Sequence, residues 1–337
     1  MVLNLEEQIA NELNLDLGQV KGAVKLLDEG NTIPFIARYR KEVTGKLPED
    51  KLREIEKRLD YLRKLEGKKE QVISSIKKQG KLTSDLQSKI QEATNLQQVK
   101  DLYRPYKQKR KTRAAKAKAK GLEPLANLFL EQKKTKGSLK ELASEYINPE
   151  YNLEAVADVL QGVRDIITQY VADQPQSRKL ARKITFERGK LVVEKRVDKV
   201  TEYQNYYDFE ARIKKIVPYQ TLAINRGENE EILKVKVTTL DERIITKLEN
   251  EFIVGNSIFK QQIKQAIEEA YNRLLAPAIA REVRSQLTEE AEKHAIQVFA
   301  KNLRNLLMQP PLDNKRVLAI DPAFRTGCKI ALLDQLG

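Results

Sequence analysis

The sequence has very few of the residues that build metal sites, disulfides and reactive thiols. Among 337 residues it contains one cysteine, Cys328, one histidine, His294, and no tryptophan. One Cys and one His cannot supply a structural zinc site or any disulfide framework. A catalytic Cys-His pair is disfavoured, because Cys328 lies in an apolar, strand-like segment and His294 lies in a helical pattern. We therefore expect a cytoplasmic protein without a cofactor.

Long apolar runs are also absent. No segment approaches the roughly 20 apolar residues of a membrane-spanning helix, and the start of the chain, MVLNLEEQIANELN, lacks the charge pattern of a secretory signal. The chain does have an excess of positive charge, with 62 Lys and Arg against 48 Asp and Glu, a formal charge of +14. Such an excess favours polyanionic partners, so we expect nucleic acid and no membrane.

Most of the chain has the apolar spacing of amphipathic helices, which predicts a mainly α protein. The first two helices are expected at 5–13 and 17–27, with Asn14 in the turn between them and a left-handed cap at Gly30. This pair fits a helix-turn-helix, and an ordinary helical hairpin is the favoured alternative because only Lys21 and Lys25 would be exposed cations on the second helix.

Further along, apolar spacing predicts more helices and a few short strands. Helices are expected at 52–65, at 84–99 with a capping box of Ser84 and Gln87, from Pro124 onward, at 155–170, at 258–284 with a kink or a division at Pro277, and at 290–307. Strands are expected in a hairpin over 184–193, at 232–237, and in a final pair at 317–320 and 328–333.

A dense run of positive charge lies between residues 104 and 120. It contains nine cations and no Asp or Glu: Arg104, Lys107, Lys109, Arg110, Lys111, Arg113, Lys116, Lys118 and Lys120. Cations at this density suit phosphate contacts, and Tyr103 and Tyr106 at its edge can either stack on bases or pack against the preceding helix. The Ala-Lys alternation over 115–120 places cations all round a helix, so we expect a flexible or extended loop until an anion neutralises the charge. The alternative is a solvated loop without a ligand.

A second group of cations, Arg38, Arg40 and Lys41, occurs in the segment ARYRKE. Guanidinium groups fork onto phosphate or pair with carboxylates such as Glu42 or Glu49. We favour ion pairing between helices for this group and keep nucleic-acid binding as the alternative. Phe35 and Ile36, directly before it, are expected in the core.

Three segments are specific enough to indicate a family. They are TIPFIARYRKEVTGKL at 32–47, DLYRPYKQKRKTRAAKAKAKGLEPLA at 101–126 and NLRNLLMQPPLDNKRVLAIDPAFRTGCKIALLD at 302–334. Together they resemble the Tex family of bacterial transcription accessory proteins, over essentially the whole chain. The resemblance implies an elongated, multi-helical N-terminal domain at 1–200, a central mostly helical region at 201–313, and the first β-hairpin of a truncated YqgF-type, ribonuclease-H-like domain at 314–337.

The resemblance also implies parts that we expect this chain to lack. Tex proteins carry helix-hairpin-helix elements and an S1-type OB-fold that binds RNA. Carboxylates hold metal in ribonuclease-H-like folds, which makes Asp321 a weak metal candidate, with Asp334 as its one possible companion. Two-metal chemistry needs several carboxylates, and an Asp before Pro is explained by turn capping. We therefore expect neither a metal nor a catalytic residue here.

The expected function is a non-enzymatic transcription accessory factor that binds RNA or single-stranded nucleic acid by sequence-independent phosphate contacts. Two alternatives remain open. In the first, the intact protein is a metal-dependent nuclease of ribonuclease-H-like type. In the second, the helical region docks RNA polymerase or the ribosome, and the OB-fold binds the nucleic acid.

Overall fold

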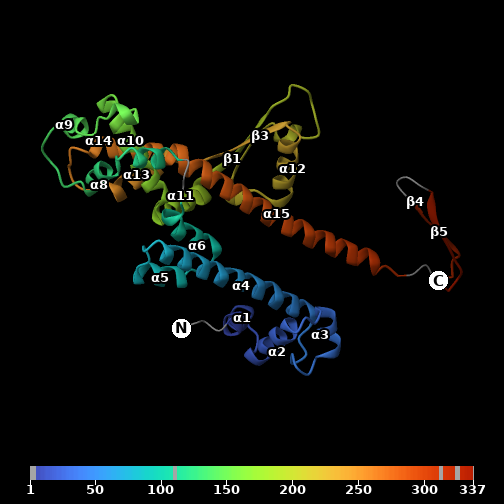
Figure 1. The fold of residues 1–337 in the computed structure, drawn as a ribbon. Coiled ribbons are helices and arrows are strands. Elements are labelled where there is room, and N and C mark those ends of the chain that lie inside the picture. Colours follow the sequence, from blue (N-terminus) through green and yellow to red (C-terminus); the bar gives the residue numbers. More distant parts are fainter. Residues whose placement is uncertain (1–4, 109–111, 311–313, 323–326, 337) are drawn as a thin grey trace. The chain divides into compact units, whose positions relative to one another are not determined.

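The computed structural model describes residues 5–108, 112–310, 314–322 and 327–336 (Figure 1). The chain divides into two compact units. Unit 1 comprises Met1–Ile184 and Leu240–Ile279, and unit 2 comprises Thr185–Thr239 and Ala280–Gly337. The described part of the chain is mainly helical, as predicted, and within it no helix is both long and apolar enough to cross a membrane. The three-part division at 200 and 313 stays a prediction.

The helices that begin in unit 1 are α1 (Leu5–Leu13), α2 (Leu17–Asp28), α3 (Ile33–Tyr39), α4 (Glu49–Lys78), α5 (Ser84–Gln91), α6 (Leu96–Tyr103), α7 (Arg113–Ala119), α8 (Glu123–Glu131), α9 (Leu139–Ser144), α10 (Val156–Asp173), α11 (Pro175–Arg188), α13 (Asp241–Phe252), α14 (Lys260–Glu269) and α15 (Ala276–Leu307). Unit 2 holds α12 (Pro218–Asn229) and the strands β1 (Lys190–Lys195), β2 (Asp208–Arg212), β3 (Leu233–Thr238), β4 (Val317–Pro322) and β5 (Cys328–Leu333). Most of α15 also belongs to unit 2.

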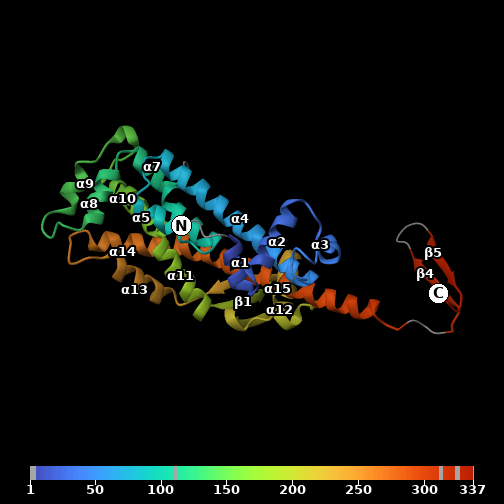
Figure 2. The ribbon, with the colours of Figure 1, turned by 90° about the horizontal axis from the view of Figure 1, so that it is seen from below.

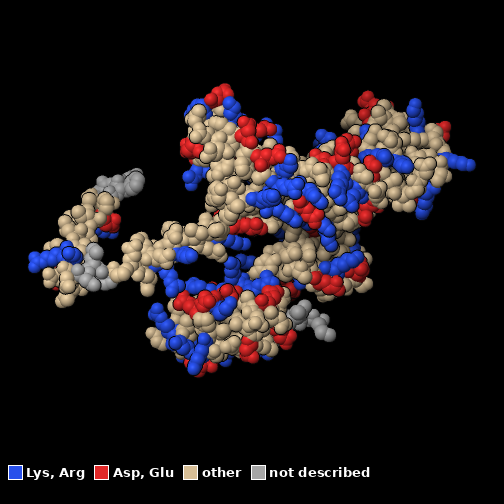
Figure 3. All heavy atoms as spheres, turned by 180° about the vertical axis from the view of Figure 1, so that it is seen from behind, with Lys and Arg blue, Asp and Glu red and all other residues tan. Residues whose placement is uncertain are grey.

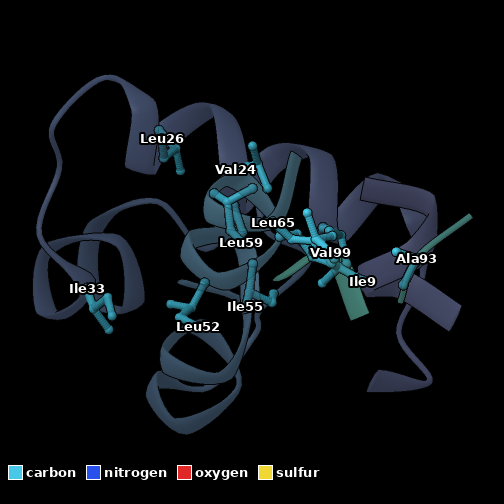
Figure 4. Close-up of a cluster of buried hydrophobic side chains, with 14 of the residues drawn as sticks. Ile9, Val24, Leu26, Ile33, Leu52, Ile55, Leu59, Leu65, Ala93 and Val99 are labelled. Carbon is cyan, nitrogen blue, oxygen red and sulfur yellow. The ribbon is translucent and has the colours of Figure 1, made fainter. Parts of the chain in front are cut away.

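The first core of unit 1 lies among α1 to α6. The long helix α4 is its centre, with α1, α2 and α3 at one end and α5 and α6 at the other (Figures 1 and 2). The predicted apolar face of α4 is buried, including Leu52, Ile55 and Leu62 at 0–1% exposure. Figure 4 shows Leu52, Ile55 and other α4 side chains in one cluster with residues of α1 to α3 and α6. The regular spacing of Leu and Ile on α4 therefore fixes this part of the fold.

The turn between the first two helices follows the prediction. Asn14 adopts a left-handed conformation with φ of 53°, and Gly30 ends the next helix with φ of 81°. Asp16 caps α2, because its carboxylate accepts hydrogen bonds from the backbone N–H groups of Gly18 and Gln19. The helix-turn-helix assignment of this pair stays a prediction.

The predicted single helix over 84–99 is in fact two helices. Thr83, and not Ser84, caps α5 by accepting from the backbone N–H of Leu86, and Asn95 caps α6 in the same way through the N–H of Gln98. A side chain that caps a helix start satisfies otherwise unpaired N–H groups. Asn95 therefore starts a new helix inside a stretch whose apolar spacing looks continuous.

The predicted hairpin over 184–193 is wrong. Residues 175–188 form α11, and only the segment after Gly189 is a strand. In unit 2, β1 pairs antiparallel with β2 on one side and β3 on the other, and β3 is the strand that was predicted. The two-residue spacing of Ile184 and Phe186 is typical of a strand, but both residues belong to the last turns of α11.

The second core of unit 1 surrounds α10. This helix contacts α7, α8, α9 and α14, and it buries its apolar positions from Val159 to Val171. Phe129 of α8 stacks on Phe259, with ring centroids 4.3 Å apart, and the Thr168 hydroxyl donates to the carbonyl of Ala266 at 3.1 Å. The helix α10 is thus the central support of this region.

The predicted kink at Pro277 takes the form of a π-helical turn over Ala270–Leu275, directly before the proline. Because proline has no N–H to donate to the preceding turn, a widened turn accommodates it. The helix α15 then continues to Leu307, so the predicted separate helices at 258–284 and 290–307 are joined through residues 284–290.

The core of unit 2 lies between its three-stranded sheet and α12. Leu191, Val193 and Leu233 of the sheet are buried together with Ile224 of α12. The outward face carries charge pairs, including Lys190 with Glu210 across β1 and β2 at 2.5 Å. The strands β4 and β5 form the predicted pair as an antiparallel hairpin. Their described residues are largely exposed, so the expectation of a buried strand at 317–320 is wrong.

Candidate nucleic-acid interface

The basic run is held against both ends of α10. Arg104 lies in a short 3-10 turn after α6, and its Nε donates to a carboxylate oxygen of Asp173 at 3.1 Å. At the other end, Lys120 donates to the carbonyl of Asn152, which precedes α10, at 3.2 Å. The run is therefore attached near both ends of α10.

Residues 113–119 form the helix α7, so the predicted loop over 115–120 is wrong. The Thr112 hydroxyl caps this helix by accepting from the backbone N–H of Ala115. Ala114 and Ala117 are buried, with 4% and 5% exposure, on the side that contacts α10. Alanine is the best helix former, and small side chains at these positions allow the close packing that outweighs repulsion between the lysines.

Close packing against α10 depends on Gly162. A Cβ atom at this position would lie 2.3 Å from the Cδ1 of Leu122, a fully buried side chain, and 3.5 Å from the Cβ of Ala117. We expect Gly162→Val to lower the free energy of unfolding by about 1–3 kcal/mol, because the core has no room for the added atoms. Urea denaturation measures this. The matched control is Gly67→Val on α4, where an added Cβ meets nothing within 4 Å, and an equal loss there would contradict the packing argument.

Three cations of the run have a protein partner. Arg104 is bound to Asp173, Lys118 pairs with Glu123 at 2.6 Å, and Lys120 meets the carbonyl of Asn152. Three others, Lys107, Arg113 and Lys116, are exposed and form no ion pair among the described residues. Lys109, Arg110 and Lys111 lie outside the described residues. We call the first three the anchoring cations and Lys107, Arg113 and Lys116 the available cations. The sequence alone does not show this distinction.

A buried carboxylate holds the start of the run in place. Asp101 of α6 has 6% exposure and accepts from the Nε of Arg178 at 3.0 Å, while a guanidinium nitrogen of Arg182 lies 2.9 Å from its other oxygen. Both arginines belong to α11. Since buried charges need partners, this group ties α6, and with it the turn that contains Arg104, firmly to α11.

The outer side of α11 carries two lysines that the sequence analysis missed. Lys179 and Lys183 are exposed and have no ion pair within the described part of the chain. Figure 3 shows Lys and Arg side chains gathered at several places on the face in view, with Asp and Glu side chains among them. The signal was the repeated Arg-Lys pair in RKLARK at 178–183, because a four-residue repeat sends one member inward and the other outward on a helix.

The two tyrosines at the edge of the run pack against the protein. Tyr103 and Tyr106 are partly buried against the core of α1 to α6, and the Tyr103 hydroxyl lies 2.9 Å from that of Ser75. Of the two roles left open by the sequence, the structure places them in the packing role.

The group Arg38, Arg40 and Lys41 makes no ion pair among the described residues, so the expected pairing with Glu42 or Glu49 is wrong. Glu49 instead pairs with Arg53 one turn along α4, at 2.5 Å. Ile36 is buried as predicted, but Phe35 is 36% exposed, and the guanidinium of Arg40 lies 5.3 Å from the centre of its ring.

Asp321 is exposed in β4, opposite Lys329 of β5. Among the described residues, no three His, Cys, Asp or Glu side chains are grouped in a way that could hold a metal ion.

Two family models match the chain. One is described as "Tex-like protein N-terminal domain" and covers residues 3–77, and the other is described as "Tex central region-like" and covers residues 135–299. The first spans α1 to most of α4, and the second extends from before α9 into α15. The basic run lies between the two matched stretches.

Relatives align with almost the whole chain. "Uncharacterized protein YdcI" of Bacillus subtilis (strain 168) is 45% identical over 99% of this chain and 47% of its own length. "Transcriptional accessory protein Tex" of Neisseria gonorrhoeae is 33% identical over 99% of this chain and 45% of its own. "S1 RNA-binding domain-containing protein 1" of Homo sapiens is 31% identical over 98% of this chain and 34% of its own. The chain spans less than half the length of each of these relatives.

Proposed function

Because this chain belongs to the family of Tex-like proteins, we propose that it is a non-enzymatic accessory factor of transcription in the cytoplasm that binds nucleic acid, RNA foremost. The cations of the basic run contact phosphates and do not read the base sequence. One observation carries this proposal. Lys107, Arg113 and Lys116 are exposed, lack an ion pair in the described structure, and are borne by segments anchored to α10.

The anchoring supports a ligand role for these three cations. The protein neutralises Arg104 and Lys118 with its own carboxylates, so acidic partners are available to this surface but are not used at the other three positions. Arg113 and Lys116 lie one turn apart on α7 and repel each other, and a bound anion relieves this repulsion. Phosphate does so with release of condensed counterions, which is the main driving force of sequence-independent binding.

The names of the relatives support the choice of partner. One relative is named for transcription and another for RNA binding, and the formal charge of +14 suits a polyanion. RNA polymerase and the ribosome remain further partners that this proposal does not require.

The test is the salt dependence of binding. Affinities of the chain for a single-stranded RNA and for DNA of equal length are measured by fluorescence anisotropy between 0.05 and 0.3 M salt, concentrations chosen to span the usual range of counterion effects. Three phosphate contacts predict a slope of log affinity against log salt of about −2 or steeper for a single strand. Two unrelated base sequences should give the same slope. A slope near zero would contradict the proposal and favour docking to protein.

A further inference from the structure

The short helix α3 presents an aromatic pair to solvent on a basic surface. Phe35 and Tyr39 lie one turn apart, with ring centroids 5.4 Å apart, and Tyr39 is 62% exposed. Residues four apart share a helix face, which is why the two rings lie together. Another face of α3 is held in the core by Ile33 and Ile36, with 5% and 0% exposure. An exposed aromatic pair of this kind is not required by the packing of the helix.

The loop that follows α3 is held rigidly. Thr44 is fully buried, and both its N–H and its hydroxyl donate to the carbonyl of Arg40 at 3.3 Å. The side-chain amide of Gln19 donates to the carbonyl of Gly45 at 3.0 Å. The loop also touches α2 directly, since a Cβ on Gly22 would lie 2.2 Å from the carbonyl oxygen of Val43. A surface fixed in this way loses little conformational entropy when it binds a partner.

Three cations lie in α3 or directly after it. Arg38, Arg40 and Lys41 are exposed and have no carboxylate partner in the described structure, and one acidic residue, Glu42, is exposed beside them. The Arg40 guanidinium already covers the ring of Phe35 at 5.3 Å, which leaves the more exposed Tyr39 as the available ring. Aromatic faces next to cations are the combination that binds single-stranded nucleic acid, because bases stack and phosphates pair with the cations.

We infer that the α3 surface, defined as Phe35, Arg38, Tyr39, Arg40 and Lys41, binds single-stranded nucleic acid by stacking a base on Tyr39. A duplex cannot use this contact, because its bases are already stacked and paired. This inference rests on the proposed function and deepens it, since it adds a preference for single strands that phosphate contacts alone do not provide. Arg38 and Lys41 contact the phosphates that flank the stacked base.

The absence of tryptophan from the chain permits a direct test. The variant Tyr39→Trp carries a single tryptophan at an exposed position, and stacking of a base on an indole quenches its fluorescence. The control is Tyr219→Trp on α12, a position with 67% exposure that has no part in the α3 surface. Both variants are titrated with a dye-labelled 12-nucleotide single strand, and binding is followed by dye anisotropy in parallel with tryptophan emission.

The inference predicts that emission of the Tyr39→Trp variant falls as the single strand binds, while that of Tyr219→Trp stays constant. Tyr39→Ser should lower single-strand affinity about tenfold, as expected for the loss of one stacked base, and Tyr39→Phe should retain it, with duplex affinity unchanged in both. Binding without quenching at position 39 would overturn this inference and leave the proposed function intact. An absence of any binding would overturn both.

Discussion

Replacing Lys107, Arg113 and Lys116 together with serine is expected to lower the affinity for a single-stranded oligonucleotide about 100-fold in 0.1 M salt. Three lost phosphate contacts make the slope of log affinity against log salt shallower by about 2, and each unit of slope corresponds to a factor of ten between 1 M and 0.1 M salt. All three side chains are exposed and unpaired in the described structure, so the fold should be unaffected. Anisotropy titrations at several salt concentrations measure both quantities.

The matched control removes the same net charge elsewhere. Lys214, Lys215 and Arg243 are exposed and form no ion pair among the described residues, so the triple serine variant at these positions reproduces the change in overall charge. It should reduce the affinity less than tenfold, because long-range charge effects are screened over about 10 Å at 0.1 M salt. Equal losses in the two triple variants would show that only net charge matters, and the assignment of the basic run would be wrong.

The second large effect concerns stability. Asp101→Ala is expected to lower the free energy of unfolding by about 3–5 kcal/mol, the usual cost of removing one partner from a buried ion pair. The carboxylate is 6% exposed and binds Arg178, itself 2% exposed, together with Arg182. Its loss leaves two positive charges without that carboxylate in a region of low solvent access. Urea denaturation followed by far-ultraviolet circular dichroism gives the magnitude.

Asp85→Ala serves as the comparison for this variant, because it removes the same side chain from an exposed pair. Asp85 binds Lys89 one turn away on α5 at 2.6 Å, and the two side chains are 73% and 58% exposed. Exposed pairs contribute about 1 kcal/mol or less, so this variant should remain close to the parent. If Asp101→Ala were no more destabilising than Asp85→Ala, the attachment of α6 to α11 through this carboxylate would be unimportant.

The helical part of the fold could be predicted because apolar residues repeat at helical spacing. On α4 the predicted positions Leu52, Ile55 and Leu62 are all buried. The errors occurred where local capping or charge decided the outcome. Asn95 starts a new helix within a continuous apolar pattern, and the charged segment over 175–188 is a helix and not half of a hairpin.

The candidate site was only partly predictable, because its organisation depends on contacts between distant residues. The sequence located the cations, but it could not show that Arg104 meets Asp173 or that Asp101 meets Arg178, pairs separated by 69 and 77 positions. For the same reason it missed Lys179 and Lys183, whose exposure follows from the inward direction of the arginines beside them. Periodicity shows which face a residue occupies, and tertiary packing decides whether its charge is neutralised.

Nucleic acid is expected to cover the available cations of the basic run. Acetylation of lysine side chains, followed by mass spectrometry, measures this in the unmodified chain with and without a saturating single strand. We expect Lys107 and Lys116 to become protected when the strand is bound, while Lys214 and Lys215 react at an unchanged rate. Equal reactivity of Lys107 and Lys116 in the free and bound protein would contradict it.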